Sequence, residues 1–250
     1  MSGHSHWAGI KHKKAMVDAR RGKLWSKLSR MIIVAARRGG GDPATNLALR
    51  YAIDKARAAN MPKDTIEKAI KRGTGGLEGS EFEEVVYEGY GPGGVAIMVE
   101  VLTDNRNRTA PEMKKLFERH GGSMGAAGCV SWMFSKRGLI TVSTSAVDED
   151  RLLGIALAAG ADDMKVSGDV FEITCEPSQF EGLKKALEEA GIPLNVAEIA
   201  LVPKSNVSVT DPEVAKKVIG LMEAIEDHDD VQNAYSNFDI PAEILTKVSS

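Results

Sequence analysis

Lysine and arginine are concentrated in the first third of this 250-residue chain. Residues 1–76 contain 17 Lys and Arg against 5 Asp and Glu, whereas residues 77–250 contain 15 against 30. Clustered cations of this kind bind polyanions, because they displace the counterions that surround phosphate groups. The first third is therefore predicted to contact nucleic acid or, on charge alone, an acidic membrane surface.

These positive residues form two groups: a short arm at residues 7–14, and a stripe along one side of the helix expected at residues 15–38. The arm has one tryptophan, which can stack on a base or serve as a local packing anchor. In segment 15–38, at about 100° per residue, the basic residues lie mostly opposite or beside an apolar face that includes Leu24, Leu28 and Ile32. A solvated face normally mixes both signs, so phosphate contact is the favoured interpretation. The predicted contacts are Trp7, Lys11, Lys13, Lys14, Arg20, Lys23, Lys27, Arg30, Arg37 and Arg38.

Arg106 and Arg108 are candidates for a second contact. They precede a helix predicted to be capped by Thr109 with Glu112, and the amino end of a helix favours phosphate. Ion pairing within the chain is an equal alternative for both arginines. The acidic residues close to them in sequence are Glu81, Glu83, Glu84 and Glu88.

Other chemistries find little support. The run Gly89 to Gly94 lacks the Lys-Ser or Lys-Thr of a phosphate-binding Walker loop, so a wide turn is expected. The acidic cluster Glu226, Asp227, Asp229 and Asp230 lacks the alternation of a calcium loop and is predicted to be a solvated helix end. We expect neither a metal site nor a cofactor. With no nucleophile elbow and no dinucleotide fingerprint, the chain is not expected to be an enzyme.

Three helices are predicted in the first third, with apolar stripes that can pack into a small domain. The first covers residues 15–38 and ends at Gly39-Gly40-Gly41. The second opens at Asp42-Pro43, a favourable cap and first-turn pair, and continues to about Ala59. The third begins at Pro62 and ends near Gly73.

Strand patterns follow a glycine-rich linker at Thr74 to Ser80. Residues 138–203 have the order strand, helix, strand, strand, helix, strand, which is a complete ferredoxin-like unit. A helix at about 212–226 and a strand at about 231–238 cannot bury their apolar faces alone, so we expect them to complete the sheet begun at 81–134. The predicted fold is α+β and multidomain: a helical domain (1–76), a discontinuous α/β-sandwich domain (77–136 plus 204–250) and an inserted ferredoxin-like α/β-sandwich domain (137–203).

Several longer motifs occur in the order known from one protein family. They are Gly3-His4-Ser5-His6-Trp7, Gly39-Gly40-Gly41-Asp42-Pro43, Asn60-Met61-Pro62, Gly89-Tyr90-Gly91-Pro92-Gly93-Gly94 and Thr103-Asp104-Asn105-Arg106-Asn107-Arg108-Thr109. On these stretches the chain resembles the YebC/PmpR family along nearly its whole length, although His6 stands where members usually have a basic residue. The resemblance implies three domains, a cytoplasmic location and one of two roles: a transcriptional regulator that binds DNA, or a translation factor that works on the ribosome.

The sequence therefore predicts a monomeric, cytoplasmic, nucleic-acid-binding regulator of gene expression. Its target is DNA, or ribosomal RNA and the ribosome. A DNA-binding regulator normally has a short recognition helix after a tight turn and a dimer interface, and the sequence shows neither clearly. A ribosome factor needs only shape and phosphate contacts, so the physical argument favours RNA. A protein-interaction module with an acidic partner is the remaining alternative.

Two further expectations concern location and mutation. No stretch approaches the ~18 apolar residues of a membrane-spanning helix, so no membrane contact is expected. Cys129 and Cys175 are too few for a disulfide framework and are expected to be reduced core thiols. Reversing Lys23, Lys27 and Arg30 to Glu is expected to abolish nucleic-acid binding and to leave the fold intact.

Overall fold

The computed structural model describes residues 18–75 and 82–248. Within residues 18–75 the chain forms three helices: α2 (Asp18–Gly39), α3 (Leu47–Ala58) and α4 (Lys63–Gly73). Their facing apolar side chains, among them Ile32, Leu49 and Ala56, are buried in one core. This segment is the small helical domain that the apolar stripes require.

The start of α3 differs from the prediction. Asp42 and Pro43 lie in a turn, and the helix begins after Asn46. The Asn46 side chain caps α3, and its amide nitrogen donates to the carbonyl oxygens of Ala35 and Gly40, each at 2.8 Å. One side chain therefore joins the end of α2 to the start of α3, and this tertiary role outweighs the local Asp-Pro signal.

The second domain has a four-stranded sheet built from two separate parts of the chain. Its strands, in order across the sheet, are β3 (Ser123–Met124), β1 (Glu83–Tyr90), β2 (Ala96–Thr103) and β9 (Val231–Ser236). β9 pairs antiparallel with β2, with Ile97 opposite Ser236. The C-terminal strand thus completes the sheet that the earlier strands begin.

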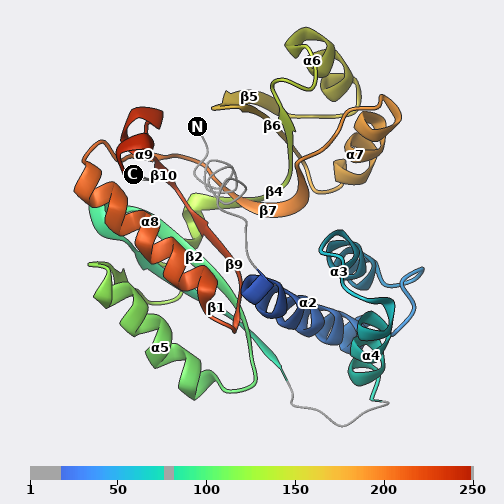
Figure 1. Ribbon diagram of the computed structural model, residues 1–250, viewed down its shortest axis with the longest axis horizontal. Helices are drawn as coiled ribbons and strands as arrows, with labels where there is room; N and C mark the ends of the chain where they lie inside the picture. The colour runs from blue at the N-terminus through green and yellow to red at the C-terminus, as the bar shows by residue number, and fades with distance from the viewer. Residues whose placement is uncertain (1–17, 76–81, 249–250) are drawn as a thin grey trace.

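Two helices cover one face of this sheet (Figure 1). They are α5 (Arg106–Arg119) and α8 (Pro212–Asp227). Each helix contributes fully buried side chains, such as Phe117 and Leu221. The predicted capping box at Thr109 is wrong, because the cap of α5 is Asn105, four residues earlier. The shorter elements are β8 (Val207–Ser208), β10 (Phe238–Asp239), α9 (Ala242–Val248) and 3₁₀ turns at Pro92–Gly94 and Ser131–Met133.

The third sheet is antiparallel and has the strand order β5-β6-β4-β7. Its elements are β4 (Phe134–Ser143), α6 (Glu149–Ala158), β5 (Asp163–Ser167), β6 (Val170–Cys175), α7 (Phe180–Glu189) and β7 (Val196–Pro203). Both helices pack against the sheet through one apolar core. This is the ferredoxin-like arrangement, and the predicted α+β multidomain fold is confirmed. The residue boundaries between the domains stay a prediction.

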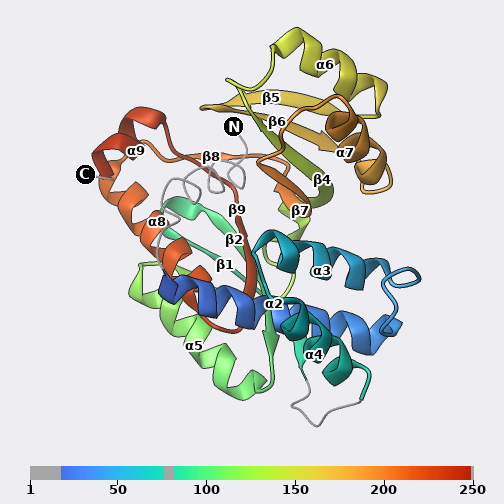
Figure 2. The same cartoon turned by 45° about the vertical axis from the view of Figure 1, so that its right-hand side comes forward.

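The three parts pack against one another (Figures 1 and 2). The face of the second sheet away from α5 and α8 packs on β4 and β7 through residues such as Met98, Tyr235 and Leu139. The helical domain lies beside both other parts, and the first turns of α2 lie next to the end of α8. No helix in the described residues is long and apolar enough to cross a lipid bilayer.

Candidate nucleic-acid interface

Half of the predicted arm and stripe lies outside the described residues. Trp7, Lys11, Lys13 and Lys14 precede the first described residue, and the side chain of Arg20 is likewise outside. These five positions stay predictions.

Three residues of the stripe contact an acidic segment of the same chain, residues 226–230. Lys23 Nζ lies 3.0 Å from Asp227 Oδ2, and Lys27 Nζ donates to the backbone oxygen of Glu226 at 2.5 Å. Both lysines reach across from α2 to the end of α8, about 200 positions further along the chain. The positive stripe of the helical domain therefore faces the negative end of the second domain.

Arg30 makes the most buried of these contacts. Its Nη1 donates to the backbone oxygen of Asp229 at 2.6 Å and pairs with Asp230 Oδ1 at 2.9 Å. The same guanidinium lies over the ring of Phe82, with Cζ 5.6 Å from the ring centroid. Three positive side chains on successive turns of α2 thus contact Glu226, Asp227, Asp229 and Asp230.

Asp230 is the centre of a buried polar network. The residue is 3% exposed, and its Oδ2 accepts hydrogen bonds from Arg108 (2.7 Å), Thr109 (2.7 Å) and Thr103 (3.1 Å). Burial alone would raise the pKa of Asp230, but the hydrogen bonds from Arg108, Thr109 and Thr103 outweigh it and hold that pKa below its usual value. Asp230 is therefore a fixed, ionised group.

Two expectations change as a result. The prediction that residues 226–230 form a solvated helix end is wrong for Asp230, which is buried, whereas Asp227 and Asp229 are exposed. The segment also contacts both α2 and α5. Arg108 pairs within the chain, with Asp104 at 3.1 Å and with Asp230, rather than with the nearby glutamates. Reversal of Lys23, Lys27 and Arg30 would place like charges against this segment, so we now expect it to separate the helical domain from the second domain while each domain keeps its own fold.

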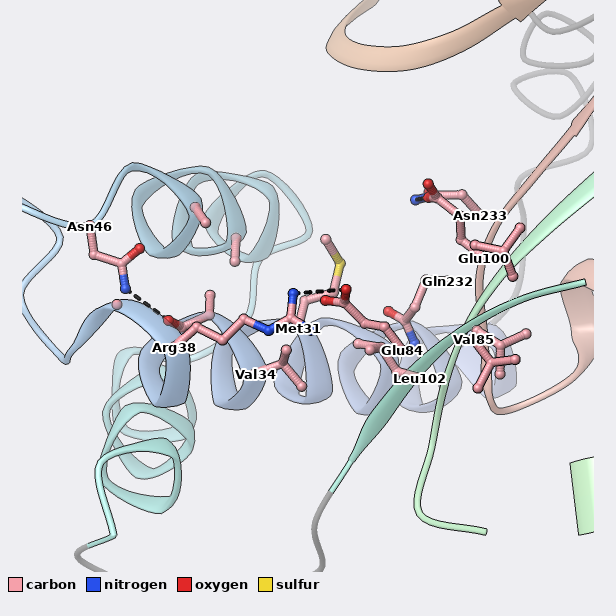
Figure 3. Close-up of a pocket in the computed structure, with 16 residues that line it drawn as sticks. Met31, Val34, Arg38, Asn46, Glu84, Val85, Glu100, Leu102, Gln232 and Asn233 are labelled. Atoms are coloured by element: carbon pink, nitrogen blue, oxygen red, sulfur yellow. Dashed lines mark hydrogen bonds and ion pairs between the residues drawn. The ribbon is translucent and has the colours of Figure 1, made fainter. Parts of the chain in front are cut away.

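A second contact between the domains surrounds a cavity of about 420 Å³ (Figure 3). It lies between α2, α3 and strands β1, β2 and β9, and most of its lining is apolar, including Met31, Val34 and Leu102. Figure 3 shows Arg38 and Glu84 pointing toward one another beside it, and their charged atoms are 2.8 Å apart. The helical domain thus meets the sheet beside this cavity, with the Arg38–Glu84 ion pair at its edge.

The helical domain also touches the ferredoxin-like domain. Lys55 Nζ lies 2.7 Å from Glu198 Oε2. The ring of Tyr51 packs edge-on against Phe180, with centroids 6.4 Å apart. Burial and a hydrogen bond with Glu181 raise the pKa of the Tyr51 hydroxyl to about 12. These contacts add to those of α2 and fix the orientation of the domain.

Other basic residues face solvent at the opposite end of the helical domain. Arg37, in the last turn of α2, and Lys71 and Arg72, in the last turn of α4, are exposed. The two helix ends are close, because a Cβ on Gly73 would lie 2.6 Å from that of Ala36. We name Arg37, Lys71 and Arg72 the distal basic patch. Sequence reasoning missed Lys71 and Arg72, although basic residues in a last turn are a usable signal.

Arg106 is exposed at the first position of α5. It lies close enough to Tyr87 for its charge to act on the pKa of that hydroxyl, which burial raises and Arg106 lowers in part. Of the two arginines predicted as a second contact, Arg106 is therefore the one open to a partner.

The described residues show no metal-binding geometry. No group of three or more His, Cys, Asp or Glu in residues 18–75 and 82–248 is arranged to hold a metal ion. Cys129 is half-buried and Cys175 is buried, and both are free thiols.

Two family models match the chain over most of its length. One is described as "TACO1/YebC protein N-terminal domain" and matches residues 5–76, and the other, "TACO1/YebC second and third domain", matches residues 82–238. Similar proteins occur in Dictyoglomus thermophilum (57% identical over 250 residues, 100% of both chains) and in Halothermothrix orenii (57% identical over 251 residues, 100% of this chain and 99% of that one). Both relatives carry the name "Probable transcriptional regulatory protein".

A solved structure has the same fold. It is the crystal structure of a conserved hypothetical protein, Aq1575, from Aquifex aeolicus. The TM-score is 0.86 at 52% sequence identity, and the match covers 96% of this chain and 99% of that chain.

Proposed function

Since the chain belongs to the TACO1/YebC family, we propose that it is a nucleic-acid-binding regulator of gene expression whose helical domain contacts the phosphates. The proposal extends to a monomer that acts in the cytoplasm and is not an enzyme. Its relatives' printed name supports a regulatory role, and the charge of the chain supports a polyanionic partner.

The observation that carries the proposal is the segregation of charge by domain. The residues before the linker hold 17 Lys and Arg against 5 Asp and Glu, and the helical domain is formed from them. The distal basic patch is exposed on this domain, at a point where two helix ends meet. An exposed group of cations on an otherwise acidic protein suits a phosphate backbone.

The geometry of α3 and α4 bears on the kind of nucleic acid. Helix α3, a four-residue connection at 59–62 and the short helix α4 follow the element order of a helix-turn-helix unit. The first turn of α4, which would meet the base edges, contains Asp64 and only one cation, Lys63, which lies 3.8 Å from Glu67, whereas Lys71 and Arg72 lie at the far end of the helix. This placement of the cations favours contact with phosphates rather than with bases. Such contact suits RNA that is recognised by its shape. Duplex DNA is the second candidate, and the relatives' name favours it.

Sedimentation of a cell lysate at low salt tests the proposal and separates the two targets. We expect the protein to migrate with ribosomes and to leave those fractions after RNase treatment. Migration with chromatin that DNase abolishes would make DNA the target. Protein that stays at the top of the gradient under every condition would contradict the proposal.

A pair of variants assigns the contact to the helical domain. Lys71→Glu with Arg72→Glu reverses two charges of the distal basic patch and should release the protein from the nucleic acid. Lys216→Glu with Lys217→Glu makes the same charge change on two exposed neighbours in α8 and should leave comigration unchanged. Equal behaviour of the two variants would remove the distal basic patch from the interface.

A further inference from the structure

We propose that the acidic segment 226–230 is an internal competitor of nucleic acid, holding the α2 stripe until phosphates displace it. The inference rests on the proposed function and concerns its regulation. In the free protein the helical domain is docked on the second domain. The phosphates of a bound nucleic acid would contact Lys23, Lys27 and Arg30 in place of the acidic segment, and the helical domain would separate from that segment.

The first support is that the acidic segment and the phosphates of a nucleic acid would bind the same nitrogen atoms of α2. Lys23, Lys27 and Arg30 carry the charges predicted to contact phosphate, and all three donate to carboxylate or backbone oxygens of residues 226–230. Carboxylate and phosphate oxygens accept hydrogen bonds from the same cations with similar geometry. One set of side chains cannot bind both at once, so the two contacts exclude each other.

The second support is that the acidic segment is held in place by its own domain. Thr103, Thr109 and Arg108, all from the second domain, fix Asp230. His228 Nδ1 accepts from Asp230 N at 3.2 Å, and its other ring nitrogen lies 3.0 Å from Glu112 Oε2. These contacts to Asp230 and His228 lie within the second domain, so they remain available when α2 leaves the segment.

The third support is the nature of the contact between the domains. It consists mainly of ion pairs and hydrogen bonds, together with Phe82 packed on the helical core, and a cavity of about 420 Å³ lies between α2 and the strands. The outermost pair is well exposed, with 46% of the Lys23 and 69% of the Asp227 side chain accessible. Exposed ion pairs are weak and are screened by salt, so a polyanion can replace them one at a time.

The competition is tested by neutralising the acidic segment in the full chain. Binding is measured by fluorescence anisotropy with a short labelled RNA hairpin and a DNA duplex of equal length. Asp227→Asn, alone and with Asp230→Asn, should bind about threefold or more tightly than the unmodified chain, because a larger fraction of the protein is open. The single Asp227 variant is the test that does not depend on Asp230, because 69% of the Asp227 side chain is exposed and its replacement should cost little stability.

A matched control separates competition from the general effect of net charge. Glu213→Gln removes one negative charge from the same helix, α8, about 20 Å from Asp227 along its axis. This variant should bind nucleic acid as the unmodified chain does. An equal gain in affinity for Glu213→Gln and Asp227→Asn would overturn the competition and leave only a net-charge effect.

The docked state is followed by zero-length coupling with a carbodiimide. This reagent joins an amine to a carboxylate in direct contact, and Lys23 and Asp227 meet that condition at 3.0 Å. The Lys23–Asp227 cross-link should form in the free protein and decline as the RNA or DNA probe saturates it. A cross-link yield that saturating probe does not change, with binding otherwise normal, would overturn the competition and leave the proposed function standing. If neither the unmodified chain nor any of these variants binds the RNA or the DNA probe, the proposed function is overturned, and the competition with it.

Discussion

Asp230 shows how much one residue can depend on contacts that are distant in sequence. Its carboxylate is bound by Arg108, Thr109 and Thr103 from the β2–α5 region and by Arg30 from α2. In the sequence, four acidic residues within five positions indicate a solvated helix end, and nothing local distinguishes the one that is buried. Only the packing of three separate elements around it makes Asp230 structural.

Acid should weaken the protein through Asp230. Because its pKa is lower in the folded chain than in the unfolded chain, its stabilising contribution is present above the unfolded value of about 4 and is lost as the pH falls. We expect Asp230→Asn to lower the free energy of unfolding in urea by about 1–3 kcal/mol at pH 7. The difference from the unmodified chain should shrink toward pH 3. The exposed neighbour Asp229, changed to Asn, is the control. A pH-independent difference would contradict this role of Asp230.

Glu88 is a second buried carboxylate, and its partners are backbone groups. It is 6% exposed and accepts hydrogen bonds from the amides of Gly128, Val130 and Ser131, each at 2.8 Å. Burial alone would raise the pKa of Glu88, but these three amides hold it below its usual value. The acid therefore fixes the loop that precedes β4.

Replacing Glu88 with Gln should therefore be costly. The substitution keeps the volume but turns an NH₂ group toward amide donors, so we expect a loss of about 2–3 kcal/mol in the free energy of unfolding. Glu83→Gln, on the exposed start of the same strand, should change stability by less than about 0.5 kcal/mol. Chemical denaturation at pH 7 measures both. Equal effects at the two positions would show that the amide contacts contribute little.

At the scale of elements, hydrophobic periodicity predicts the type and order of helices and strands well, whereas capping signals predict the first residue of a helix poorly. The element order expected for residues 138–203 is the observed order of β4, α6, β5, β6, α7 and β7, because apolar patterns define these elements. The expected starts at Asp42 and Thr109 are wrong, because other side chains take the capping role. Thr109 instead buries its hydroxyl against Asp230, a partner more than a hundred positions away.

The contact of α2 with α4 depends on a glycine. A Cβ at Gly73 would lie 2.5 Å from the Ile33 oxygen and 2.6 Å from the Ala36 Cβ, so Gly73→Ala must push the helices apart. We expect a loss of about 1–3 kcal/mol, although alanine is the better helix former. Gly22→Ala in α2 meets nothing within 4 Å and should stabilise the protein by up to about 1 kcal/mol. Thermal unfolding compares the two, and a stable Gly73 variant would contradict the close contact.

At the scale of the molecule, the sequence predicts two oppositely charged parts but not that they bind each other. Charge counts identify the helical domain and the stripe of Lys23, Lys27 and Arg30, and the family resemblance is confirmed. Docking of the stripe on residues 226–230 cannot be predicted from composition, because it depends on how folded domains are oriented. Lys71 and Arg72 were missed for a similar reason: their proximity to Arg37 arises only when α4 packs on α2.

Reversing the stripe should therefore change the shape of the protein as well as its binding. Lys23→Glu, Lys27→Glu and Arg30→Glu together place like charges against the acidic segment, and we expect the helical domain to leave the second domain. Small-angle X-ray scattering should show a larger radius of gyration, while circular dichroism keeps the helix and strand content. Affinity for nucleic acid should fall by about 10-fold or more at low salt. An unchanged radius of gyration would show that these ion pairs do not hold the domains together.

The most direct test of the whole account is photo-cross-linking of a 4-thiouridine-labelled RNA, and of a 4-thiothymidine-labelled DNA, to the full chain, with the attached peptides identified by mass spectrometry. The account predicts cross-links within the first 76 residues, on the peptides of α2 and α4, that decline as salt is raised. Cross-links confined to the ferredoxin-like domain, or none with either probe, would contradict it.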